Sequence, residues 1–174
     1  ATKRFLKCEN IVRVSCNSVG TMDSIVKIFS HHEKLKVFHN GVNLESFVPN
    51  DNLDNLVSKL NIPDKCKIVS YIGNTYRGRG IEKIIELSKK HKEIFFLVVG
   101  GEEEDNSYYL KSVDSTQSNI LFTGHVPHED IPNYLCISDI LLIPYGSDFT
   151  IKGGSFAKDY SSPIKLFEYL SAGK

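Results

Sequence analysis

Short, almost continuously apolar runs alternate along the chain with segments in which apolar residues recur every three or four positions. The apolar runs end at or near Gly or Pro and cover residues 67–73, 93–101, 119–124 and 139–145. Runs of this kind are typical of strands that are buried on both faces. The segments with helical spacing cover residues 81–91, 107–115 and 127–138. The alternation predicts βαβ units and an α/β fold with a parallel sheet.

The N-terminal region shows the same periods less clearly. Its expected elements are a strand at 10–18, a helix at 21–30, a strand with a turn at 35–42 and a linker at 43–52. We expect residues 1–47 to close a preceding domain and end in a hinge, and residues 48–174 to form a second domain. The last helical pattern ends in Gly173-Lys174 with no strand after it, which predicts a fragment cut at both ends.

The composition of the chain limits the kinds of molecule that it is expected to bind. The 174 residues are 41% hydrophobic, enough for a real core, and 21 basic residues balance 21 acidic ones. This balance gives no sign of a nucleic-acid-binding surface, so any phosphate must be bound by local groups. The four cysteines lie far apart and indicate reduced thiols that fill the core, and no metal site is expected. No apolar run approaches the roughly 18 residues of a membrane span, and we expect a cytoplasmic protein.

The segment "GNTYRGRG", residues 73–80, joins an apolar run to a helical pattern and is close to a phosphate-binding P-loop. A P-loop needs Lys and then Ser or Thr at its end, where this chain has Arg79 and Gly80. The segment therefore fails as a nucleoside-triphosphate loop. A plain tight turn and a phosphate site of another kind remain as alternatives.

Two expected helices begin with cations where the helix dipole favours acids. Arg77 and Arg79 precede the helix that starts near Ile81. In "SSPIKLFE", Ser162 is a natural N-cap, Pro163 follows it, and Lys165 falls in the first turn. An external anion at both helix ends would explain the pattern, and two such ends favour a diphosphate. The alternative is that these are ordinary surface residues, with Lys165 paired to Glu168.

The spacing of the last helix also predicts which side faces the core. Its expected buried stripe is Pro163, Leu166, Phe167 and Leu170. Lys165, Glu168 and Ala172 would then lie on the open face, where the lysine meets phosphate and the carboxylate accepts from sugar hydroxyls. Tyr145, at the end of the last apolar run, either flanks the ligand or caps the strand.

Five segments in order resemble the retaining group 1 glycosyltransferases of the GT-B fold. They are "VFHNGVNLESF", "VSYIGNTYRGRGIEKIIELS", "FFLVVGG", "NILFTGHVPHEDIPNYLCISDILLIPY" and "SSPIKLFEYLSAGK". The second is similar to the family's Gly-Arg-x-x-x-x-Lys-Gly loop and the last to the end of its E-x7-E motif. The resemblance implies a Rossmann-like C-terminal half of a GT-B fold, with residues 48–174 as the nucleotide-sugar (donor) binding domain, truncated before its last elements.

The resemblance also implies site residues. For the diphosphate these are Arg79, at the place of the family's Lys, together with Gly78, Gly80 and Lys165; Asn74 replaces the family's Arg, and Arg77 is the candidate substitute for that charge. For the base they are His125 and Val126, and for the ribose Glu168. Eight positions before Glu168 stands Tyr160 rather than the family's first Glu, so the donor-sugar region is expected at Asp159, Tyr160, Ser162 and Ile164. No catalytic residue is assigned within this chain.

The activity that the resemblance implies is transfer of a hexose from a UDP- or GDP-sugar, with retention and without cofactor or metal. The expected acceptor is a glycan or lipid-linked molecule of cell-envelope polysaccharide synthesis, bound by the missing N-terminal domain. The full-length protein would be cytoplasmic, with the inner face of the membrane as an alternative location. The chain alone is expected to bind donor without turnover. A non-catalytic nucleotide-sugar-binding module and a GT-B nucleotide-sugar epimerase remain alternatives.

Overall fold

A computed structural model describes residues 8–29, 33–49, 52–146 and 163–174. The contacts among these residues divide them into two compact units. Of the described residues, one unit contains those up to Gly41 together with Pro163 and Ile164, and the other runs from Val42 through the main sheet and includes Lys165–Lys174. The assignment of residues 1–47 to an acceptor domain and of 48–174 to a donor domain stays a prediction.

The N-terminal unit is a strand, a helix and a strand. Strand β1 (Val14–Cys16) pairs in parallel with β2 (Leu35–Val37), and helix α2 (Val19–Phe29) connects them. The start of α2 is capped because the Ser18 hydroxyl accepts a hydrogen bond from the Thr21 amide at 3.1 Å. Cys16 and Leu35 form a small buried core. The strand–helix–strand order predicted for this region is confirmed, with shorter strands than expected.

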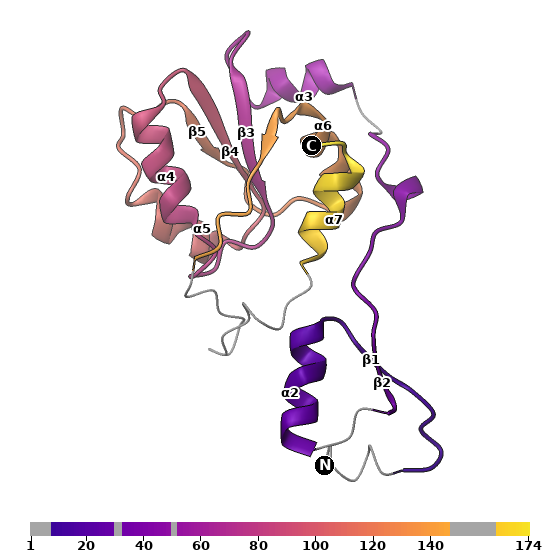
Figure 1. The fold of residues 1–174 in the computed structure, drawn as a ribbon. Coiled ribbons are helices and arrows are strands. Elements are labelled where there is room, and N and C mark those ends of the chain that lie inside the picture. The colour runs from indigo at the N-terminus through magenta and orange to yellow at the C-terminus, as the bar shows by residue number, and fades with distance from the viewer. Residues whose placement is uncertain (1–7, 30–32, 50–51, 147–162) are drawn as a thin grey trace. The chain divides into compact units, whose positions relative to one another are not determined.

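The C-terminal unit contains a four-stranded parallel sheet (Figure 1). Its strands are β3 (Lys67–Ile72), β4 (Ile94–Val99), β5 (Ile120–Phe122) and β6 (Ile140–Leu141), in the spatial order β5-β4-β3-β6. The helical elements are η1 (Leu44–Ser46), α3 (Leu53–Lys59), α4 (Ile81–Lys90), α5 (Glu103–Leu110), η2 (His128–Asp130), α6 (Ile131–Ile137) and α7 (Ile164–Ser171). The predicted Rossmann-like α/β fold with flanking helices is confirmed.

Helices cover both faces of the sheet because alternate residues of its central strands point to opposite sides. Ile68 and Ile72 of β3 belong to one buried cluster, which also contains residues of α6 and α7. Val69 and Tyr71 of the same strand belong to a second cluster, with Ile81 and other residues of α4. Each central strand is thus buried on both faces, as the nearly continuous apolar runs in the sequence indicated, although β3 begins with Lys67 and contains the buried Ser70.

One helix was not predicted, and two expectations need correction. Helix α3 begins at Leu53, directly after the predicted linker, because the Asn52 side chain accepts hydrogen bonds from the amides of residues 54 and 55. Helix α5 begins at Glu103, four residues earlier than predicted, since three acidic residues in its first turn suit the helix dipole. The cysteines are free thiols, but only Cys16 is buried and Cys8 is exposed, so they are not mainly core residues.

Candidate functional site

The loop between β3 and α4, residues 73–80, is shaped by glycines at the carboxyl end of the sheet. Gly78 and Gly80 have φ values of 86° and 80°, in the left-handed region that favours glycine. A Cβ atom on Gly80 would also overlap the carbonyl oxygen of Pro144, which follows β6. The loop therefore passes directly against the segment after β6, and only glycine fits there.

A buried hydrogen bond holds this loop against α5. Thr75 is fully buried, and its hydroxyl donates to the side-chain oxygen of Asn106 at 2.7 Å. The Asn106 amide in turn donates to the carbonyl oxygen of Gly100 at 3.0 Å. Sequence reasoning missed both side chains because the partners lie 31 positions apart and neither belongs to a recognisable motif. Together they fix the path of the loop relative to the ends of β3 and β4.

Arg79 lies between two tyrosine rings. Its guanidinium carbon is 4.2 Å from the ring centre of Tyr76 and 5.2 Å from that of Tyr145. One guanidinium nitrogen, Nη1, also donates to the Tyr145 hydroxyl at 3.0 Å. Tyr145 therefore contacts a predicted ligand-binding residue and does more than end a strand. These contacts restrict the side-chain rotamers of Arg79 before any ligand arrives.

The other two polar residues predicted from this loop have different surroundings. Arg77 is exposed, and its guanidinium carbon lies 4.6 Å from the ring centre of Tyr108 on α5. Asn74 is also exposed, and its backbone carbonyl accepts a hydrogen bond from the Tyr71 hydroxyl at 2.6 Å. The structure thus gives Arg77 and Arg79 different aromatic neighbours. Compensation of Asn74 by Arg77 stays a prediction.

Lys165, in the first turn of α7, lies beneath the same loop. Its ammonium nitrogen donates to the carbonyl oxygen of Ile72 at 2.5 Å and lies 4.2 Å from the ring centre of Tyr71. A Cβ atom on Gly73 would overlap this nitrogen, so glycine is needed at the position where the lysine reaches β3. Burial, reinforced by the positive charge of Arg79, lowers the pKa of Lys165 to about 7.

The predicted orientation of α7 is wrong. Leu166 and Leu170, expected in the core, are 42% and 61% exposed, whereas Tyr169 is only 4% exposed. The Tyr169 hydroxyl accepts a hydrogen bond from the Ile72 amide at 3.0 Å. Tyr169 and Lys165 are one helical turn apart, and both hydrogen-bond the last residue of β3, which fixes this face against the sheet. Lys165 therefore lies on the inner face, not on an open one.

Glu168 also faces inward, with 16% of its side chain exposed. Its carboxylate lies 3.6 Å from Nε2 of His128 in η2. The Lys165–Glu168 ion pair that offered an ordinary explanation for the lysine is not among the ion pairs found in the described parts of the chain. Lys165 and Glu168 both lie on α7 and both face inward, but the described residues show no direct ion pair between them.

The remaining predicted residues fall into two groups. Val126 is half-buried and packs on the same cluster as Tyr169, which brings the 125–126 segment next to α7, while His125 is exposed. Ile164 is 50% exposed at the start of α7. Asp159, Tyr160 and Ser162 lie outside the described residues.

Within the described ranges, no group of His, Cys, Asp and Glu side chains is placed to hold a metal ion. The same ranges contain no helix whose length and apolar character would suffice to cross a membrane. Arg79 and Lys165 come together at the carboxyl ends of parallel strands, beside the start of α4, whose N-cap Gly80 supplies no side-chain hydrogen bond. Such a place favours an anion.

Comparison with known proteins identifies a family. Residues 53–174, well over half of the chain, match the family described as "Glycosyl transferases group 1". The phosphatidylinositol N-acetylglucosaminyltransferase GPI3 subunit of Saccharomyces cerevisiae (strain YJM789) is 30% identical over 139 residues, which are 76% of this chain and 30% of that protein. The chain spans about a third of the length of the curated relatives that it matches, between 30% and 37%.

Solved structures share the fold at low sequence identity. A glycosyltransferase from Rickettsia africae ESF-5 superposes with a TM-score of 0.74 and 20% identity, over 99% of this chain and 46% of that one. Anabaena Alr3699/HepE, in its complex with UDP and glucose, has a TM-score of 0.68 and 17% identity, over 94% of this chain and 43% of that one. These likenesses confirm the GT-B type of α/β fold.

Proposed function

The chain belongs to the group 1 glycosyltransferases, and from this premise we propose that its C-terminal unit binds the nucleoside diphosphate of a UDP- or GDP-sugar donor. The diphosphate would lie between the 73–80 loop and the first turn of α7. Gly78 and Gly80 allow close approach of the backbone. Arg79 and Lys165 supply the charge.

The observation that carries the proposal is the burial of the Lys165 ammonium group close enough to Arg79 to be affected by its positive charge. Burial chiefly, and the charge of Arg79 in addition, disfavour the protonated lysine and lower its pKa. A diphosphate would reverse that cost, because its charge would favour the protonated lysine and accept hydrogen bonds from the guanidinium. Anabaena Alr3699/HepE, which shares the fold, has been solved with UDP and glucose, which supports a donor of this class.

The same placement of the diphosphate suggests roles for the other predicted site residues. Glu168 is proposed to accept hydrogen bonds from ribose hydroxyls, the role acidic residues take in dinucleotide folds. The backbone at His125 and Val126 is proposed to meet the base, and Asn74 and Arg77 to lie near the phosphates. Asp159, Tyr160, Ser162 and Ile164 are proposed to contact the donor sugar.

The proposed reaction is hexosyl transfer with retention at the anomeric carbon, independent of a metal. In this scheme the two cations and the start of α4 stabilise the departing nucleoside diphosphate as its charge develops. The acceptor site is proposed to lie outside this chain, which spans about a third of the length of its curated relatives. A glycan or lipid-linked acceptor of cell-envelope polysaccharide synthesis is proposed, as is association of the full-length protein with the membrane surface.

Thermal unfolding in the presence of nucleotide sugars tests the donor site. UDP-glucose or GDP-mannose is expected to raise the melting temperature of the chain, because only the folded state binds it. Arg79→Ala and the nearly isosteric Glu168→Gln should remove the rise. Lys90→Ala, which deletes an exposed cation at the far end of α4, should keep it. A folded chain that shows no rise with any nucleotide sugar would refute the donor site.

A further inference from the structure

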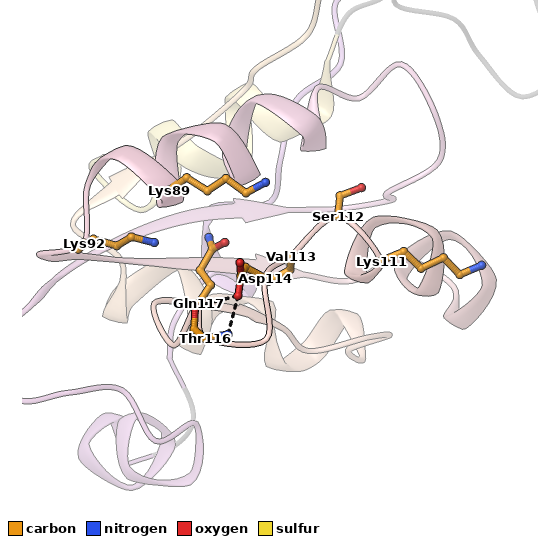
Figure 2. Close-up of a pocket in the computed structure, with 8 residues that line it drawn as sticks. All are labelled: Lys89, Lys92, Lys111, Ser112, Val113, Asp114, Thr116 and Gln117. Carbon is orange, nitrogen blue, oxygen red and sulfur yellow. Dashed lines mark hydrogen bonds between the residues drawn. The ribbon is translucent and has the colours of Figure 1, made fainter.

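A second candidate site lies at the opposite end of the sheet, where the parallel strands begin. It is a hollow of about 380 Å³ between the end of α4, the turn before β4 and the connection from α5 to β5 (Figure 2). This volume falls in the range of roughly 300 to 1,000 Å³ that small-molecule sites occupy. We call it the lysine pocket, and its lining is Lys89, Lys92, Lys111, Ser112, Val113, Asp114, Thr116 and Gln117.

The charge of the lysine pocket is positive. Three lysines from three segments and a single carboxylate, that of Asp114, line the hollow. The lining therefore carries three positive charges and one negative charge. The Asp114 carboxylate accepts hydrogen bonds from the amide and the hydroxyl of Thr116, at 2.9 and 2.8 Å. These bonds lower the pKa of Asp114 and are the larger cause of that shift, with Lys89 and Lys92 adding to it. Figure 2 shows the ammonium groups of Lys89 and Lys92 extending over the hollow.

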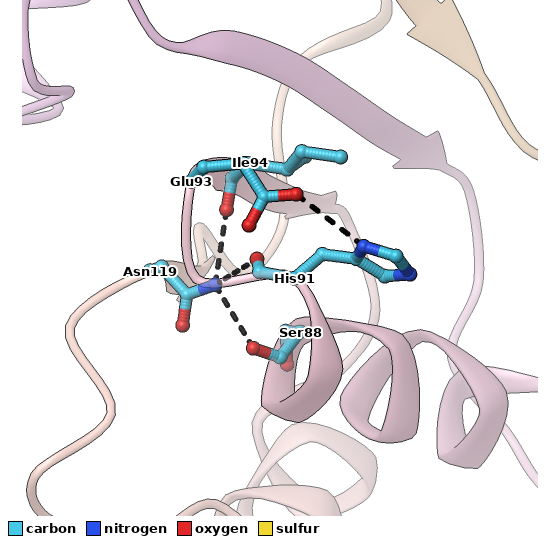
Figure 3. A network of polar contacts seen from close by, with 5 residues as sticks. All are labelled: Ser88, His91, Glu93, Ile94 and Asn119. Atoms are coloured by element: carbon cyan, nitrogen blue, oxygen red, sulfur yellow. Dashed lines mark hydrogen bonds and ion pairs between the residues drawn. The ribbon is translucent and has the colours of Figure 1, made fainter.

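The backbone that carries these lysines is held in place by Asn119, just before β5. Its side-chain amide lies within hydrogen-bond distance of three carbonyl oxygens, those of Ser88, His91 and Ile94, at 2.9, 2.9 and 3.0 Å (Figure 3). The side chain thereby ties together the last turn of α4 and the turn into β4. Lys89 and Lys92 both lie in this clamped segment, so their backbone positions are fixed although their side chains are exposed.

Gln117 ties the connection before β5 to the end of α4. It is 8% exposed, and its amide nitrogen donates to the Ser88 hydroxyl. Its amide oxygen, Oε1, is closed off from solvent and is therefore not open to a ligand in the hollow. A ligand suited to this site would carry an anionic group for the lysines.

We propose that the lysine pocket binds a soluble phosphate monoester. The phosphate would accept hydrogen bonds from Lys89 and Lys92, with Lys111 adding longer-range attraction. The site is separate from the donor site, because the lysine pocket lies at the amino ends of the strands and the 73–80 loop at a carboxyl end. Exposed lysines bind phosphate weakly, so we expect a dissociation constant of the order of 1 mM that rises with salt.

The test is an NMR titration of the whole chain, because the positions of the perturbed amides separate this site from the donor site. Glucose 1-phosphate at low salt should shift the amides of Lys92, Thr116 and Gln117 in a saturable way. The double variant Lys89→Gln/Lys92→Gln should weaken this binding by about fivefold or more. The control Lys59→Gln/Lys90→Gln removes two exposed positive charges outside the pocket and should leave it unchanged.

Two further probes separate the phosphate from the rest of the ligand. Methyl phosphate carries the same charge without sugar hydroxyls and should bind with an affinity within about twofold of glucose 1-phosphate, whereas loss of the saturable shifts would overturn the assignment of the site to the phosphate group. Absence of saturable shifts at these amides, or equal shifts in the double variant, would overturn the site. Sedimentation with phosphatidylinositol vesicles distinguishes a lipid source. Pelleting of the chain that the double variant abolishes would replace the soluble ester with a lipid headgroup.

Discussion

The two ends of the main sheet hold positive charge in opposite ways. At the carboxyl ends, Lys165 is largely buried against β3 and Arg79 lies between two tyrosine rings. At the amino ends, the lysines of the lysine pocket are exposed and the fixed parts are backbone and buried amides. At the carboxyl ends the charged side chains themselves are held in place. At the amino ends only the backbone that carries the lysines is held in place.

This difference predicts different behaviour towards anions. Cations held in place before binding lose little side-chain entropy when a ligand arrives, whereas exposed lysines lose much of theirs. At the carboxyl ends, the charged residues also support the loop. Their substitution should therefore affect the stability of the fold as well as ligand binding, and ligand binding should depend on the protonation of Lys165. We therefore expect substitutions there to change stability and affinity together, and substitutions in the lysine pocket to change anion affinity alone.

The largest effect is expected at Gly80. Gly80→Ala combines a left-handed φ with overlap of the new Cβ and the Pro144 carbonyl, and should destabilise the chain by about 2 to 4 kcal/mol. Gly124→Ala is the matched control, since its φ is 73° but nothing lies within 4 Å of the new Cβ; about 1 kcal/mol is expected. Urea unfolding measures both. Equal losses would show that the close approach to Pro144 contributes nothing.

The second prediction concerns the pH dependence of donor binding. In the free protein Lys165 has a pKa of about 7, so it is mainly neutral above that pH. A bound diphosphate favours the protonated lysine and raises its pKa again, so binding takes up a proton above about pH 7. The dissociation constant of UDP-glucose should therefore rise with pH, approaching a tenfold rise per unit between about pH 7 and 9.

Calorimetric titrations of three proteins isolate the contribution of Lys165. Lys165→Met keeps much of the buried volume and should bind more weakly at pH 7, with a flatter pH profile than the wild type. Lys89→Met, which removes a lysine at the other end of the sheet, should retain the wild-type profile. If Lys165→Met kept the wild-type slope, the proton would be taken up elsewhere and the proposed contrast between the two ends would be lost.

The smallest effect is expected for Tyr145→Phe. This change removes the hydroxyl that accepts from Arg79 at 3.0 Å and keeps the ring beside the guanidinium. Loss of one hydrogen bond that positions a cation should weaken UDP-glucose binding by about three- to tenfold, with little change in stability. Tyr108→Phe, on the ring that Arg77 covers, is the control and should bind as the wild type. Unchanged affinity in Tyr145→Phe would mean that the hydrogen bond from Arg79 to the Tyr145 hydroxyl contributes nothing to donor binding.

Sequence patterns predicted the sheet because its central strands are buried on both faces. Their nearly continuous apolar runs are typical of such strands and do not have the spacing of a surface helix. They failed for α7, where Leu166 and Leu170 suggested the wrong face. The hydrogen bonds from Tyr169 and Lys165 to β3 decide the orientation of that helix, and periodicity within the helix cannot represent them. No element was predicted for the segment after residue 52, where α3 begins, although Asn52 is a good N-cap.

The sequence by itself determined the α/β class, the glycine-shaped loop and the presence of cations at two helix starts. These features depend on local conformation and on spacing along one segment. Only the tertiary structure decided that Arg79 lies between Tyr76 and Tyr145, that Lys165 is buried beneath Gly73, and that Thr75 meets Asn106. The reason is physical: the pKa of a lysine and the orientation of an arginine depend on which distant segments pack around them, and packing is a property of the folded chain.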